Sequence, residues 1–259
     1  MTYRIATFNA NSIRARLDII LAWLSRHRPN VLCLQETKVP DEDFPIKPII
    51  QAGYQVVFKG QKSYNGVAVL CLSQPDEVSW GLGGDDREAD VRLLSVRVDG
   101  LRVVNTYIPQ GREVGTPHFA YKLDFFKRLG EYFQSGFSSQ EPLIWAGDLN
   151  VALTDEDVYD PKRLSGQVCF HPDEQAALKA VAQWGLVDVF RRHHPEGRAF
   201  TFWDYRLPKS VDRNLGWRID YIWVTQPLAE RSTDAFVDLE PRRMPKPSDH
   251  TFLVADFEL

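Results

Sequence analysis

The chain has 259 residues, of which 44% are apolar and 25% charged, and 31 lysines and arginines against 35 aspartates and glutamates give it a formal net charge of −4. This composition is typical of a soluble globular protein. The acidic balance argues against a protein that grips nucleic acid by bulk positive charge, unless the acids gather at a metal site and leave basic surface elsewhere. Because the three cysteines lack paired spacing and no apolar run approaches a membrane span, a disulfide or zinc framework and a membrane protein are excluded.

The first half of the chain alternates short apolar runs with one helical stretch. A strand is predicted at residues 3–8, and further strands at 31–34, 54–58, 67–72, 93–98 and 102–107. Between the first two, a helix carries the apolar stripe Leu17, Ile20, Leu21 and Leu24 and ends before Pro29. Cys33 and Cys71 fall inside apolar runs, so we interpret them as buried strand residues in a reducing cytoplasm.

The second half continues with two helices and four strands. A helix with apolar residues from Phe119 to Phe133 ends near Gly136, and a third begins at Pro172 and ends before Gly185. Strands are predicted at 143–146, 200–203, 219–224 and 252–257, and surface loops at 78–90 and 207–216.

Strands outnumber helices, and short turns join many neighbouring strands. This favours a four-layered α/β sandwich, in which two packed, mainly antiparallel β-sheets are flanked by helices, over a doubly wound parallel sheet. No repeat, low-complexity tract or linker divides the chain, so residues 1–259 are predicted to form a single domain.

Polar residues stand at the ends of several predicted strands, most of them just after a strand and two just before the final one, and we expect these ends to converge on one rim of the sandwich. They are Asn9, Asn11, Glu36, Tyr107, Asp148, Asn150, Asp249 and His250. Taken singly, each has an ordinary interpretation: an asparagine in a turn, Glu36 paired with Lys38, His250 as a satisfied histidine. Asp148 and Asn150 project the same way if the strand continues, but a turn at Gly147–Asn150 is equally open.

Asp220 is different because it interrupts an aromatic and β-branched strand. A buried carboxylate is costly unless it is paired or coordinated. The neighbouring Arg218 is a poor partner, since alternation sends the two side chains to opposite faces. Together, these carboxylates and amides are oxygen ligands of the kind that suit Mg²⁺ or Mn²⁺. Such an ion can neutralise phosphate charge while a carboxylate-activated water attacks phosphorus.

Seven segments, spread over almost the whole chain, carry a family resemblance. TFNANSIRAR, LCLQETKV, NTYIPQG, GDLNVALTDED, FTFWDYR, NLGWRIDYIWV and KPSDH resemble, in this order, the motifs of exonuclease III and the related apurinic/apyrimidinic endonucleases. The resemblance implies the endonuclease/exonuclease/phosphatase sandwich. It also implies a monomeric, metal-dependent DNA repair enzyme that cleaves duplex DNA 5′ to abasic sites and removes nucleotides or blocking groups from 3′ ends.

The resemblance also implies roles for individual residues. Glu36 corresponds to the main ligand of Mg²⁺, or of Mn²⁺, with Asn9, Asp220 and Asp249 near the ion. Asp148 corresponds to the carboxylate that activates the attacking water, Asn150 to the amide that positions it, and Tyr107 to a phosphate contact. His250, held by Asp249, corresponds to the donor to a nonbridging phosphate oxygen. Asp148, Asn150 and His250 are further candidates for the metal site.

Substrate contacts follow from the same comparison. Phe202, Trp203 and Trp217 resemble an apolar pocket for a base-less sugar, although they could equally fill the core. Lys209 and Arg213, in the predicted loop, are expected to contact DNA phosphates, and Asn11 to lie beside the substrate.

Two positions depart from the family pattern. Ser12 stands where the family often has glycine, and it would be strained if the backbone there needs a positive φ. His171 either precedes the third helix, with Pro172 in the first turn, or faces the DNA channel.

Two other functions stay open: a phosphodiesterase or phosphatase of this fold with a non-DNA substrate, and a catalytically weak nucleic-acid-binding regulator.

Overall fold

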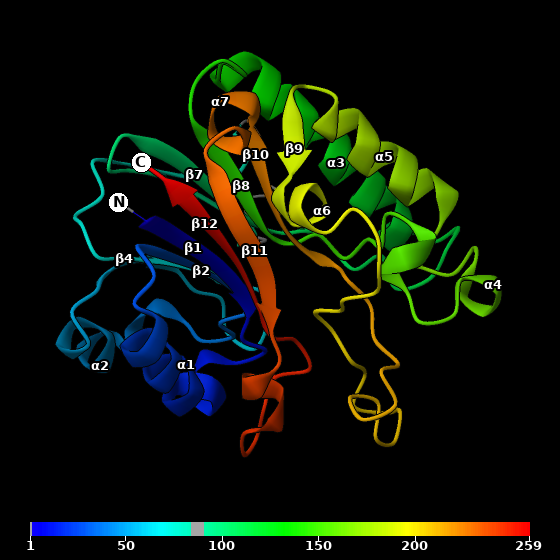
Figure 1. Cartoon of the computed structure of the whole chain (residues 1–259), viewed down its shortest axis with the longest axis horizontal. Coiled ribbons are helices and arrows are strands. Elements are labelled where there is room, and N and C mark those ends of the chain that lie inside the picture. Colours follow the sequence, from blue (N-terminus) through cyan, green and yellow to red (C-terminus); the bar gives the residue numbers. More distant parts are fainter. Residues whose placement is uncertain (1, 84–90) are drawn as a thin grey trace.

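The computed structural model describes residues 2–83 and 91–259, and it arranges them as two six-stranded sheets between helices (Figure 1). Sheet A has the order β11 (Ser232–Asp238), β12 (Phe252–Glu258), β1 (Thr2–Asn9), β2 (Val31–Gln35), β4 (Val67–Cys71) and β3 (Gln55–Lys59). Sheet B has the order β5 (Glu77–Trp80), β6 (Leu93–Val98), β7 (Leu101–Tyr107), β8 (Leu143–Asp148), β10 (Asp220–Thr225) and β9 (Leu186–Asp188). Only the β1–β2 and β7–β8 pairs are parallel, so the prediction of mainly antiparallel sheets is confirmed.

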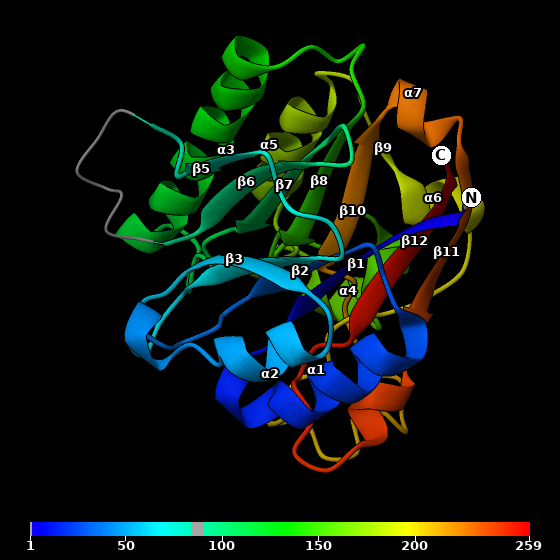
Figure 2. The same ribbon diagram turned by 90° about the vertical axis from the view of Figure 1, so that its left-hand side faces the viewer.

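Helices cover the outer face of each sheet and complete the four layers (Figures 1 and 2). Sheet A carries α1 (Ile13–His27) and α2 (Ile46–Gln51), and sheet B carries α3 (Pro117–Gly136) and α5 (Pro172–Ala182). The remaining helices are short: α4 (Pro161–Leu164), α6 (Val189–His193), α7 (Gln226–Ala229), and the 3₁₀ turns η1 (Asp41–Asp43), η3 (Asp155–Asp157) and η4 (Glu240–Arg243). No described helix combines the length and the apolar character that a membrane crossing requires.

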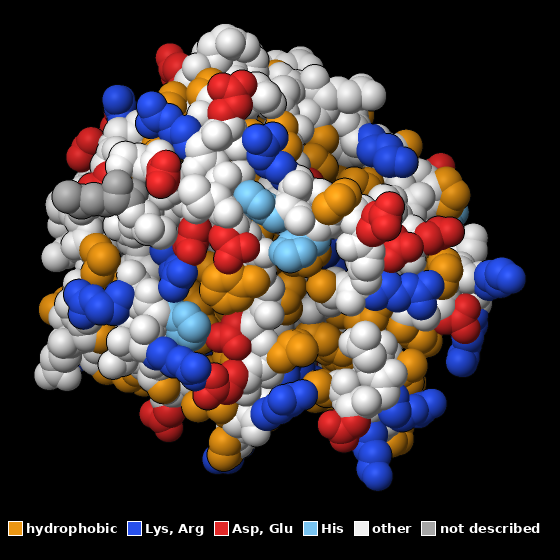
Figure 3. Space-filling model, viewed as in Figure 1, with side chains coloured by type: hydrophobic (Ala, Val, Ile, Leu, Met, Phe, Trp, Pro, Cys, Tyr) orange, Lys and Arg blue, Asp and Glu red, His pale blue; other side chains and the backbone are white. Residues whose placement is uncertain are grey.

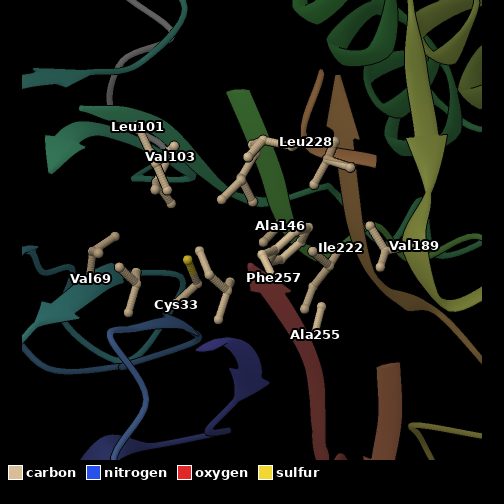
Figure 4. Packing of buried hydrophobic residues seen from close by; sticks show 14 of the residues in the cluster. Cys33, Val69, Leu101, Val103, Ala146, Val189, Ile222, Leu228, Ala255 and Phe257 are labelled. Carbon is tan, nitrogen blue, oxygen red and sulfur yellow. The ribbon is translucent and has the colours of Figure 1, made fainter. Parts of the chain in front are cut away.

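Strict alternation along the strands separates three apolar layers. In β8, Ile144 and Ala146 face the other sheet, whereas Leu143 and Trp145 face α3 and α5. Figure 4 shows side chains of both sheets, among them Cys33 and Val103, pointing into the layer between the sheets. Because both faces of the central strands are buried, these strands read as continuous apolar runs.

Most predicted elements are confirmed, and the exceptions have physical reasons. Residues 200–203 form no strand, only isolated bridges from Phe202 to Trp217 and His250. Three edge strands, β5, β9 and β11, were not predicted, because edge strands need less apolar sequence. The predicted loop at 78–90 begins inside β5, and its residues 84–90 lie outside the described part of the chain. The loop at 207–216 is confirmed as a series of turns.

Candidate active site

The polar residues predicted at strand ends do meet at one rim. The parallel strands β1 and β2 end there, as do β7 and β8. Because β12 is antiparallel to β1, and β10 to β8, these two strands begin where their neighbours end, which sets Asp220 directly opposite Asp148. The close approach of β8 to β7 requires a glycine at position 147, since a Cβ there would lie 1.9 Å from the carbonyl oxygen of Thr106 on β7.

Asn9, at the end of β1, holds the two central carboxylates together. Its side-chain amide nitrogen donates to Glu36 Oε1 and to Asp148 Oδ2, at 2.8 Å each, and its Oδ1 accepts from the backbone N–H of Asn11 at 2.9 Å. The amide therefore presents donors, not an oxygen, to the carboxylates. The metal contact expected for Asn9 stays a prediction, since the amide group donates to both carboxylates in this arrangement.

His250 lies between two buried carboxylates. Its Nδ1 is 2.8 Å from Asp220 Oδ2, and its Nε2 is 3.7 Å from Asp148 Oδ2. The expectation that Asp249 holds this histidine is wrong, since adjacent residues of an extended chain project to opposite sides. Asp249 accepts instead from Asn11 Nδ2, at 3.0 Å.

Asp220 avoids its neighbour Arg218, as alternation predicted. The Arg218 guanidinium is buried among Asp157 and Asp188, with its Nε 2.7 Å from Asp157 Oδ1 and its Nη1 2.7 Å from Asp188 Oδ2. Oδ2 of Asp220 contacts Nδ1 of His250. Oδ1 of Asp220 has no hydrogen-bond partner although it is buried.

Burial and neighbouring charges raise the pKa values of three groups at this rim. Burial by itself would lower the pKa of His250, but the carboxylates of Asp220 and Asp148 outweigh it and raise the pKa to about 10. Burial, with the charges of Asp220 and Glu36, raises the pKa of Asp148 to about 7, although the imidazolium opposes the shift. Burial and the charges of Glu36 and Asp148 raise the pKa of Tyr107. At neutral pH, His250 is therefore a cation and Tyr107 a neutral hydroxyl.

The donor set fits a hard divalent cation next to Glu36. Four carboxylates gather here, those of Glu36, Asp148, Asp220 and Asp249. Among the described residues, His250 pairs with Asp148 and Asp220, and Lys38 Nζ lies 2.5 Å from Glu36 Oε2. The suggested Glu36–Lys38 pair thus exists, but inside the site. His250 also lies in this group, since one ligand atom each of Asp148, Asp220 and His250 lies within 4.8 Å of the others, and its role as a ligand stays a prediction. Asn150 directs its amide nitrogen to the carbonyl of Ile108, at 3.0 Å.

A pocket of about 590 Å³ opens beside the carboxylates, and Asp148, Asn150, Asp249 and His250 lie in its wall. Phe202 and Trp217 line the pocket as expected, and the Phe202 ring lies 4.9 Å from that of His250. Trp203 does not line it. Its side chain is 1% exposed and packs beneath Gly216, because it points away from its neighbour Phe202.

The other predicted residues lie around this centre. Lys209 and Arg213 are exposed on the 207–216 loop, which projects from the same end of the molecule as the segment around η4 (Figure 1). His171 is the N-cap of α5, where its Nδ1 accepts from the backbone of Asp173, so its helix-start interpretation is confirmed. Ser12 has φ 92° and ψ 103°, the conformation in which serine is strained.

Sequence reasoning missed a second pocket of about 490 Å³ on the other side of Glu36 and Tyr107. Lys38, Arg92 and Arg112 bring positive charge to its wall, and His118 lies beside them. On the face shown in Figure 3, by contrast, basic and acidic side chains are interspersed. The four basic residues come from separate segments, and of these only Lys38 and Arg112, which follow β2 and β7, have a position that could have suggested them.

Comparisons with known proteins agree with this geometry. The model of the Endonuclease/Exonuclease/phosphatase family matches residues 6–250. The exodeoxyribonuclease III of Haemophilus influenzae is 35% identical over 98% of this chain and 100% of its own length. An AP endonuclease from Archaeoglobus fulgidus is 43% identical, with a TM-score of 0.96 over 99% of this chain and 100% of its own. The 3′ phosphatase NExo of Neisseria, bound to a product DNA hairpin, is 34% identical with a TM-score of 0.94, at 99% and 100% coverage. With its strand-end carboxylates, its four layers and these relatives, the chain belongs to the endonuclease/exonuclease/phosphatase family.

Proposed function

We propose that this protein is a metal-dependent DNA repair nuclease that cleaves duplex DNA 5′ to abasic sites and removes nucleotides or blocking groups from 3′ ends. The observation that carries the proposal is the buried group of Asp148, His250 and Asp220 beside Glu36, at the mouth of an aromatic pocket. Relatives named exodeoxyribonuclease III and DNA-(apurinic or apyrimidinic site) endonuclease support the reaction class.

In this proposal the three buried groups divide the chemistry of phosphodiester hydrolysis. Asp148 accepts a proton from the attacking water, for which a pKa near 7 is well suited. Asp220 keeps His250 protonated and oriented, so that its Nε2–H can donate to a nonbridging phosphate oxygen where negative charge develops. Asn150 positions the water, and the neutral Tyr107 hydroxyl contacts the phosphate.

Glu36, with Asp148 and Asp249, would hold a Mg²⁺ ion, for which Mn²⁺ could substitute because both prefer oxygen ligands. When bound, the ion supplies charge neutralisation for the phosphate and its leaving oxygen. It also offsets the repulsion among the four carboxylates. Lys38, now 2.5 Å from Glu36, would move its ammonium group toward Asn11, to which it already donates at 2.6 Å.

The pocket beside His250 suits a sugar without a base. Phe202, Trp217, Leu164 and Ile219 give it apolar walls, and the carboxylates stand at its mouth. An abasic nucleotide is cheaper to flip out of the helix than one that still carries a stacked base, which adds to the selectivity.

The proposal is tested with three matched duplexes, one with an abasic site, one with a nick and one with a 3′-phosphate. Each is incubated with Mg²⁺ and with EDTA, and products are resolved by length and end group. Asp148→Asn should lower the rate by about 10²–10⁴, as expected when a general base is lost. The matched control is Asp173→Asn, on an aspartate whose side chain is 64% exposed, and it should keep the wild-type rate.

Cleavage in EDTA, or a wild-type rate in Asp148→Asn, would contradict the proposal. A chain that leaves all three duplexes intact but hydrolyses a phosphoinositide or an RNA tail would place the same centre on a non-DNA substrate.

A further inference from the structure

A buried lysine behind the active site has no place in the chemistry proposed above. Lys122, in the second turn of α3, is completely buried and lines neither pocket. Its Nζ donates to the carbonyl of Asn150 at 2.7 Å, to the carbonyl of Gln110 at 3.2 Å and to Glu174 Oε1 at 2.5 Å. These three oxygen acceptors match the three donors of the ammonium group, which also lies 4.0 Å from Cys169 Sγ.

The three acceptors belong to three separate segments, and two of them, Gln110 and Asn150, line the pocket. Gln110 follows β7, Asn150 follows β8, and Glu174 lies in the first turn of α5. Glu174 Oε2 also accepts from the backbone N–H of His171, at 3.2 Å, and so fixes the chain just after Cys169, another wall residue. The Lys122 ammonium therefore contacts all three segments, which are also joined by the backbone bonds from Ile108 N–H to the Asp148 carbonyl and from Ala152 N–H to the Cys169 carbonyl.

The connection continues to the proposed general base. The backbone N–H of Asn150 donates to Asp148 Oδ1 at 2.9 Å, while the carbonyl of the same residue is held by Lys122. Asn150 has φ 51°, a turn conformation that can relax when its carbonyl is released. A shift of this residue would therefore move Asp148 relative to His250.

We propose that Lys122 is a positioning residue, which acts through the carbonyls of Asn150 and Gln110 to set the placement of Asp148 and the shape of the pocket. The inference rests on the proposed function, because it assigns Lys122 a task in that site. A buried ion pair is weak evidence for stability, since well-packed apolar residues often replace one without loss. An apolar residue at position 122 could not replace the hydrogen bonds that Lys122 donates to the carbonyls of Asn150 and Gln110.

The test separates stability from catalysis. Lys122→Met should leave Glu174 unpaired and lower the melting temperature, whereas the double variant Lys122→Met/Glu174→Met should recover most of that loss. Both should keep a kcat reduced by about 10- to 100-fold, as expected from a small misplacement of catalytic groups. KM for abasic duplex should change by less than about threefold, because the DNA-facing residues are intact.

Glu174→Gln is the reciprocal variant. It should lower the melting temperature, since the amide cannot serve both Lys122 and the His171 N–H, yet keep kcat within about threefold because both carbonyl contacts remain. Lys127→Met, on an exposed lysine of the same helix, is the matched control and should behave as wild type. The inference is overturned if kcat follows melting temperature through the series, so that the double variant regains both and Glu174→Gln loses both. A wild-type kcat in Asp148→Asn would instead overturn the proposed function, whatever the Lys122 variants do.

Discussion

Arg218 offers a prediction whose size can be worked out from the structure. Its buried guanidinium makes three hydrogen bonds to carboxylates: Nε and Nη2 to Asp157, at 2.7 and 3.2 Å, and Nη1 to Asp188, at 2.7 Å. It also lies 4.4 Å from the ring centroid of Tyr221. Arg218→Met keeps the volume of the stem but leaves two carboxylates without this partner. Removing one partner of a buried ion pair costs about 3–5 kcal/mol.

A loss of this size should be plain in thermal unfolding. At about 2–4 °C per kcal/mol for a chain of this length, the melting temperature should fall by roughly 6–20 °C. Urea unfolding at pH 7 gives the free energy directly. The control is Arg206→Met, whose side chain is 89% exposed and paired only with Asp204, and it should change stability by less than about 0.5 kcal/mol.

The deficit of Arg218→Met should depend on pH. Burial alone would raise the pKa of Asp157, but Arg218 and Arg191 hold it below its ordinary value. In the wild type this carboxylate therefore contributes stability above pH 4, which is lost as the pH falls through its lowered pKa. In Arg218→Met, burial raises the pKa of Asp157 with less opposition from positive charge. Protonation of Asp157 then removes its unpaired charge, so the stability lost in the variant should shrink between pH 7 and pH 4. A deficit below about 1 kcal/mol at pH 7, or one that grows on acidification, would refute this reasoning.

Three further predictions concern Asp220, the start of α1 at Ser12, and the metal site at Glu36. Asp220→Asn should lower kcat by about 10²–10⁴ with little loss of DNA binding, because the variant no longer holds the His250 imidazolium in place; a kcat within threefold of wild type would show that Asp220 has no such role. Ser12→Gly should raise the free energy of unfolding by roughly 1 kcal/mol in urea titrations, since glycine adopts φ 92° without strain; a lower urea midpoint would contradict the strain. Chelation by EDTA should abolish cleavage, and excess Mg²⁺ or Mn²⁺ should restore it. The variant Glu36→Gln should need a higher metal concentration for its half-maximal rate. An unchanged metal dependence in this variant would show that Glu36 is not a ligand.

Local pattern accounts for what could be predicted of the fold. Continuous apolar runs such as those of β2 and β4 have no polar face, so they had to lie between two covering layers. The same logic singled out Asp220, because a carboxylate in such a run demands a partner. It failed at residues 200–203, whose aromatic side chains pack without pairing as a strand.

The sequence by itself determined which residues stand at strand ends, which faces of the strands are apolar and that Asp220 needs a partner other than Arg218. Only the tertiary structure decided that this partner is His250, that Asn9 is a donor between two carboxylates, and that Trp203 lies beneath the pocket instead of lining it. Alternation is a local property with a period of two residues and is legible in any strand. The contacts that make the site join residues up to 238 positions apart, as in the bond from Asn11 to Asp249, and the bond from Asn9 to Asp148 depends on how two sheets pack against each other.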